Sequence, residues 1–155
     1  MSRKGIRWDR RVEVALVLLA GILFGSWREF TFINLNYQID HVARATPFSY
    51  AHSMVRRWIG DWGLSALLTL KWGLAFLSMA VICGLCIVLA RILFGHWRQA
   101  RWIALGFAGF AVLSLVLHGL AAWVPGLEEV ALGLSHMLQY PVPLVFVLIA
   151  AMLPR

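Results

Sequence analysis

The feature that most constrains this chain is a set of long stretches without a charged side chain. Three of them approach or exceed the about 20 apolar residues that cross a hydrocarbon core, namely Trp72–Ala90, Trp102–Leu127 and Val130–Pro154. Hydrophobic residues make up 61% of the 155 positions and charged residues 14%, which leaves too little polar surface to cover a water-soluble globule. The sequence therefore predicts an integral membrane protein.

A fourth apolar run, Val14–Trp27, is shorter, but the residues that follow extend it to Ile33. Arg28 interrupts this region, and we expect its long side chain to reach outward to the membrane boundary. A cleaved signal peptide is the alternative, and the bulky Leu23 and Phe24 before the possible cut disfavour it. We predict a single all-α domain, a polytopic membrane protein with four transmembrane helices over about 10–33, 63–91, 102–124 and 130–153.

The segment between the first two spans, about 34–62, is the one sizeable piece expected outside the membrane. Pro47 predicts a break in it. Beyond this break, apolar residues recur at helical spacing, with Arg56 and Arg57 on the other side; they are Val55, Trp58, Ile59 and Trp62. This pattern predicts an amphipathic helix on the outer face. Such a helix lies either in the membrane interface or against the other spans.

The distribution of basic residues predicts the orientation. Nine Lys and Arg side chains fall on the side of the N-terminus and four on the opposite side. Cytoplasmic loops carry the excess of such residues, so we expect a multi-pass protein of the cell inner membrane with both termini in the cytoplasm. The net charge of +7 resides at the ends of the apolar runs. That placement indicates lipid headgroups, and not nucleic acid, as the partner.

Small residues and prolines mark the spans themselves. Pairs of small residues four apart allow helices to approach closely; they are Gly21 and Gly25, Ala80 and Gly84, and Ala104 and Ala108. Pro141 and Pro143 predict a kink near the middle of the fourth span, with backbone carbonyls freed around residues 137–139.

Polar residues within the spans are the candidates for function, because their burial in lipid is costly. His118 and His136 are placed symmetrically about Gly126-Leu127, which predicts equal depths on neighbouring helices. Lys71 on the second span, and Gln139 and Tyr140 beside His136, fall in the same outer half.

Three interpretations compete for these polar residues. The first is a structural hydrogen-bond network. The second is a docking surface for another membrane subunit, formed by Lys71, Gln139 and Tyr140 together with Arg56 and Arg57. The third is a haem b with His118 and His136 as axial ligands, although directly adjacent helices leave little room for a porphyrin.

Other reactive residue types lack the spacing that chemistry requires. Cys83-x-x-Cys86 occupies one turn of an apolar helix without a positive group nearby, which favours small core residues over a redox pair. No metal-binding spacing links His41, His52 and His96, which we expect to be solvated at the interface. No catalytic triad is evident, and phosphate-binding glycine loops are absent from the sequence.

Several short stretches resemble a small multi-spanning membrane protein family associated with exosortase systems in Bacteroidota. The similar stretches are Arg28-Glu29-Phe30 leading to Asn34 and Asn36, Leu70-Lys71-Trp72, Leu138-Gln139 with Pro141, and the aliphatic run to Leu148-Ile149-Ala150. The resemblance implies an accessory to a sorting or export apparatus. The chain lacks the Cys, Arg and His arrangement of the exosortases themselves, so the resemblance implies no peptidase activity.

From these features we expect a non-enzymatic accessory or assembly subunit of a larger inner-membrane complex, linked to protein sorting or export. Its expected partners are the lipid bilayer and other integral membrane subunits, and no cofactor is expected. Two alternatives stay open. One is a redox subunit that binds haem b or a quinone, and the other is a small transporter that acts as an oligomer with a water-accessible Lys71.

Overall fold

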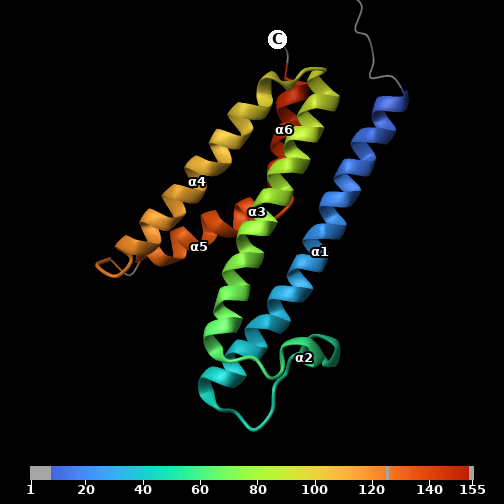
Figure 1. Ribbon diagram of the computed structural model, residues 1–155. Coiled ribbons are helices and arrows are strands. Elements are labelled where there is room, and N and C mark those ends of the chain that lie inside the picture. The colour runs from blue at the N-terminus through green and yellow to red at the C-terminus, as the bar shows by residue number, and fades with distance from the viewer. Residues whose placement is uncertain (1–7, 125, 154–155) are drawn as a thin grey trace, which may run out of the picture. The chain divides into compact units, whose positions relative to one another are not determined.

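The computed structural model of the protein describes residues 8–124 and 126–153, except for the side chains of residues 8 and 9. Every regular element among the described residues is a helix, as predicted (Figure 1). The elements are α1 (Trp8–Arg44), α2 (Ser53–Ile59), α3 (Leu64–Phe94), the short 3-10 helix η1 (Trp97–Gln99), α4 (Ala100–Leu120), α5 (Gly126–Gln139) and α6 (Val142–Met152).

Three helical stretches are each long and apolar enough to cross a membrane: Arg10–Arg44, Leu64–Phe94 and Trp97–Leu120. The fourth predicted span is a pair of helices, α5 and α6, bent by 67° at their junction. By length and composition, the described residues thus contain three helices that could each span a membrane, or four if the bent pair counts as one span. A polytopic all-α membrane fold is confirmed.

The chain divides into two compact units. Unit 1 contains the described parts of residues 1–23 and 79–155, and unit 2 contains residues 24–78. Both α1 and α3 pass from one unit to the other.

Unit 2 is built on the second half of α1, the α2 segment and the first half of α3. Leu35, Ile59 and Leu67, one from each helix, are buried together at its centre. Five partly buried apolar side chains surround them: Ile39, Val42, Val55, Leu70 and Leu74. Because each helix supplies one side of this core, the α2 segment is held against α1 and α3.

The expected end of the first helix near residue 33 is wrong, because α1 continues to Arg44. Residues 34, 35, 38 and 42 recur at helical spacing and face the core of unit 2, so the helix is stabilised by packing well past the apolar run. It ends where Ala45 takes a positive φ of 49° and Thr46 precedes Pro47, which disfavours helical backbone at Thr46. The irregular part of the predicted outer segment is correspondingly shorter.

The predicted amphipathic helix forms as α2. Its Val55 and Ile59 pack into the core of unit 2, whereas Trp58 is 80% exposed. The helix ends before Trp62, so the expected four-residue apolar face is divided. Two placements were expected for this helix, and Val55 and Ile59 adopt the second one: they pack against the other helices of unit 2.

In unit 1, α4 and α5 form an antiparallel hairpin. The hydroxyl of Ser114 on α4 donates to the carbonyl of Ala131 on α5 at 2.8 Å. The connection between α3 and α4 and the end of α6 lie at the same end of this unit, and the α4–α5 turn lies at the opposite end (Figure 1). Helix α4 starts two residues and ends four residues earlier than predicted, and α5 starts four residues earlier than the predicted fourth span.

The predicted kink in the fourth span is confirmed at the junction of α5 and α6. Tyr140 still donates its N–H to the carbonyl of His136 at 3.2 Å. Pro141 has no N–H to continue the helix, and α6 begins after it with Leu144 donating to the Pro141 carbonyl at 3.1 Å.

Candidate functional site

Polar side chains gather at the α5–α6 junction. Gln139 is 2% exposed, and its amide nitrogen donates to the Ser135 hydroxyl at 2.8 Å. The ring of Tyr140 meets that of His136 edge to face, with 6.4 Å between centroids. Each contact joins residues four apart, and the hydrogen bond to Ser135 satisfies the Gln139 amide nitrogen next to the break.

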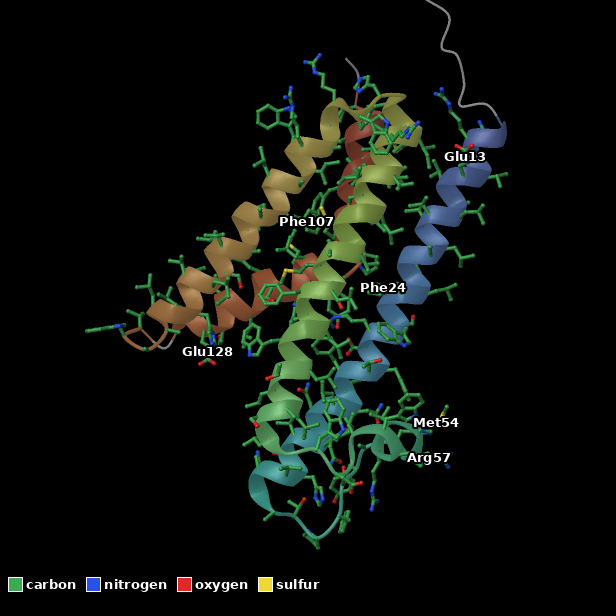
Figure 2. All side chains as sticks on the ribbon, viewed as in Figure 1. Glu13, Phe24, Met54, Arg57, Phe107 and Glu128 are labelled. Atoms are coloured by element: carbon green, nitrogen blue, oxygen red, sulfur yellow. The ribbon has the colours of Figure 1, made fainter. Side chains whose placement is uncertain are left out.

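Beside this junction the helices of unit 1 form a half-open groove with a volume of about 300 Å³, which we call the break pocket. Its lining is apolar on every side and comes from α3, α4, α5 and α6. The lining residues are Cys86, Ile103, Gly106, Phe107, Phe110, Leu134, Met137, Leu138, Pro143, Phe146 and Val147. Figure 2 shows Phe107 between α4 and α3.

The bend and one glycine explain why this space is open. Since α6 leaves the direction of α5 by 67°, the two helices cannot fill the corner between them. Opposite this corner, Gly106 on α4 has no side chain, and a Cβ placed there would meet no atom within 4 Å. This lining is an apolar surface in which the Cys86 thiol is the one ionisable side chain.

Arginines mark the end of unit 1 nearest to the pocket. Arg91 lies in the last turn of α3, and its guanidinium carbon is 4.1 Å from the centroid of the Trp97 ring. Arg98 and Arg101 follow in η1 and at the start of α4, and all three arginines are exposed. We call Arg91, Arg98 and Arg101 the basic end.

The predicted equal depth of His118 and His136 is wrong. Helix α4 already ends at Leu120, and Gly126 and Leu127 belong to α5, so the hairpin turn precedes them. His118 is therefore two residues from the end of α4, whereas His136 is ten residues, or about 15 Å, from the start of α5. Both side chains are exposed, and haem ligation by this pair stays a prediction.

The residues expected to form one docking surface belong to different units. Gln139 and Tyr140 lie in unit 1, whereas Lys71, Arg56 and Arg57 lie in unit 2. Arg56 and Arg57 are exposed on α2, where they line a cavity of about 340 Å³ with Ala51 and Ser53. Figure 2 shows Arg57 on α2. Lys71 is half-buried near the start of α3.

Cys86 is buried and lines the break pocket, while Cys83 is half-buried; both thiols are free. This placement fits the expected role as small core residues. Among the residues that the structure describes, no three His, Cys, Asp or Glu side chains come together as a group that could hold a metal ion.

Sequence reasoning missed the polar residues that organise unit 2. The outward-reaching Arg28 predicted from the sequence is wrong, because this residue is 3% exposed. Its guanidinium contacts the Glu29 carboxylate at 3.3 Å and lies 4.4 Å from the centroid of the Phe32 ring. Burial of a paired arginine among apolar helices satisfies the charge locally.

Asn34 and Gln38 fasten the loop around α2 to α1. The Asn34 side chain accepts from the N–H of His52 and donates to the Phe30 carbonyl at 2.7 Å. Gln38 donates to the carbonyl of Gly60 at 3.1 Å. The helical spacing of Arg28, Leu35 and Gln38 is the signal that could have placed them on one buried face.

No protein-family model matches this chain, and neither a curated protein nor a solved structure matches it.

Proposed function

We propose that this protein is a non-enzymatic accessory or assembly subunit of a larger inner-membrane complex. The observation that supports the proposal is the exposure of two small-residue pairs on the spanning helices. Ala80 and Gly84 on α3 are exposed, and so are Ala104 and Ala108 on α4. A Cβ added at Gly84 would meet nothing within 4 Å.

The third small-residue pair, Gly21 and Gly25, is buried, in contrast to the two exposed pairs. Gly21 on α1 is buried, and a Cβ added there would overlap the Leu144 side chain of α6. The chain thus uses one close-approach position for its own packing. The surfaces of Ala80–Gly84 and Ala104–Ala108 have the shape that a helix of another subunit needs in lipid, where packing of small residues drives association.

The weak burial of α4 supports the same proposal. Only 6% of the most apolar window of Trp97–Leu120 is buried, against 33% for Leu64–Phe94. The resemblance to the exosortase-associated family directs the proposal toward a complex that sorts or exports proteins.

Co-purification of the full chain in mild detergent tests the proposal. We expect a membrane protein to accompany the wild type and to be lost from an Ala104→Leu/Ala108→Leu variant, because the added side chains prevent close approach. Gly109→Leu is the matched control, since Gly109 is also exposed on α4 with open space around it but points to another side of the helix. A lone, monodisperse wild-type chain without a companion would contradict the proposal.

A further inference from the structure

The break pocket has the size and chemistry of a site for a single hydrocarbon chain. A volume of about 300 Å³ stands at the lower limit of the roughly 300–1,000 Å³ of small-molecule sites. A helix of a partner subunit is about 10 Å wide with its side chains, so this space is too small to receive one. The phenyl rings of Phe107, Phe110 and Phe146 favour flexible methylene groups.

The position of the pocket along α4 relates it to the basic end. Its lining on α4 runs from Ile103 to Phe110, and the helix begins at Ala100. At about 1.5 Å per residue, the pocket extends from about 5 to about 15 Å beyond the start of the helix. A chain that enters from this end would have its polar head beside η1.

The positive charges at the basic end favour a lipid with an anionic head group. Arg98 and Arg101 are exposed; Arg98 lies two residues before the start of α4, and Arg101 is its second residue. The rings of Trp97 and Trp102 are 53% and 64% exposed there, as is typical of indole rings at headgroup depth. A phosphate with net negative charge complements this pair of guanidinium groups.

We propose that the break pocket binds one acyl chain of an anionic phospholipid from the surrounding bilayer, with its phosphate at Arg98 and Arg101. The lipid then fills the corner that the bend between α5 and α6 leaves open. The proposal is independent of the subunit role, because it concerns a site within unit 1 and needs no partner protein.

Photo-crosslinking of the full chain in lipid nanodiscs tests the chain-binding part. The probe is phosphatidylglycerol with a diazirine in one acyl chain, and mass spectrometry locates the labelled peptides. We expect labels on the α4 and α6 peptides that line the pocket. Gly106→Leu fills the cavity and removes several methylene groups from burial, so labelling should fall by about tenfold.

Gly119→Leu is the matched control for Gly106→Leu. Gly119 lies on the same helix with open space around it and does not line the pocket, so we expect wild-type labelling. Met137→Trp narrows the pocket from α5 and provides a second test should Gly106→Leu fail to fold. Absence of label at the lining, or unchanged labelling in correctly folded pocket variants, would overturn the proposal.

The head-group part is tested with the same probe on phosphatidylcholine. We expect the wild type to label more strongly with phosphatidylglycerol, and an Arg98→Gln/Arg101→Gln variant to label equally with both lipids. Arg57→Gln removes an exposed arginine from unit 2 and should keep the preference. Equal labelling of the wild type by the two lipids would overturn the anionic head group.

Discussion

At Gly21, the backbone of α1 lies against α6, and a Cβ there would overlap Leu144 Cδ1 while standing 3.6 Å from the Cβ of Pro141. Gly84 on α3 has nothing within 4 Å of the same position. One residue type therefore serves two purposes: close packing inside the chain at Gly21, and an open small-residue surface at Gly84.

We expect Gly21→Ala to destabilise the protein and Gly84→Ala to leave it unchanged or stabilise it. Overpacking costs about 1–3 kcal/mol, which outweighs the about 0.5–1 kcal/mol that a helix gains when alanine replaces glycine. Thermal unfolding in detergent measures both variants. Equal midpoints would show that Leu144 moves aside without cost.

The side chain of Asn34 accepts a hydrogen bond from the backbone N–H of His52, and its removal provides a second test. Asn34→Ala leaves a backbone N–H without its acceptor, at a cost of about 1–3 kcal/mol. We expect faster hydrogen exchange in residues 45–63, measured by mass spectrometry. Asn36→Ala, at an exposed position of the same helix, should exchange like the wild type. Equal rates in both variants would mean that Asn34 does not hold the loop.

Substitution of His118 tests the alternative that this protein is a haem-binding redox subunit. A haem held by His118 and His136 would give the purified protein a Soret band that disappears in His118→Ala. Under the proposed accessory function we expect a featureless visible spectrum before and after reduction. A band that depends on His118 would replace the accessory function by the redox one.

At the scale of the elements, the α5–α6 break is the feature that shapes unit 1. Pro141 stands where the helix would otherwise continue, whereas Pro143 lies in the first turn of α6, where a missing N–H is tolerated. We therefore expect Pro141→Ala to reduce the 67° bend and Pro143→Ala to preserve it.

Spin labels at Leu132 and Ile149, both exposed, measure this change in a background without cysteine. Straightening moves the two labels apart, so their distance should lengthen in Pro141→Ala alone. An unchanged distance would mean that packing of unit 1, and not the missing N–H, maintains the bend.

The boundaries of the helices could be predicted only in part from the sequence. Hydropathy indicated the apolar helices and Pro141 their break, since both depend on local chemistry. The start of α5 was missed although Glu128 and Glu129 in its first turn are typical of a helix N-terminus. That error moved the hairpin turn and produced the wrong symmetry of His118 and His136.

The extension of α1 to Arg44 was less accessible from the sequence. It depends on Leu35 meeting Ile59 and Leu67, which are distant along the chain. The break pocket likewise arises from the packing of four helices around Gly106, and no local pattern encodes a cavity.

For the whole molecule, the basic residues predict that both termini are cytoplasmic. The corresponding expectation is that a tag at either end is labelled only after the inner membrane is made permeable, whereas a cysteine at exposed Trp58 is labelled in intact cells. Cys83 and Cys86 are replaced by serine in this experiment. Labelling of the two ends from opposite sides would contradict the predicted topology.

The weak burial of α4 affects how this protein should be extracted from the membrane. With so few of its apolar residues covered by the rest of the chain, α4 depends on surrounding amphiphiles for most of its van der Waals neighbours. Harsh delipidation should therefore loosen α4 from α5 while the core of unit 2 stays folded, and gentle extraction with retained native lipid is the condition under which the hairpin keeps its form.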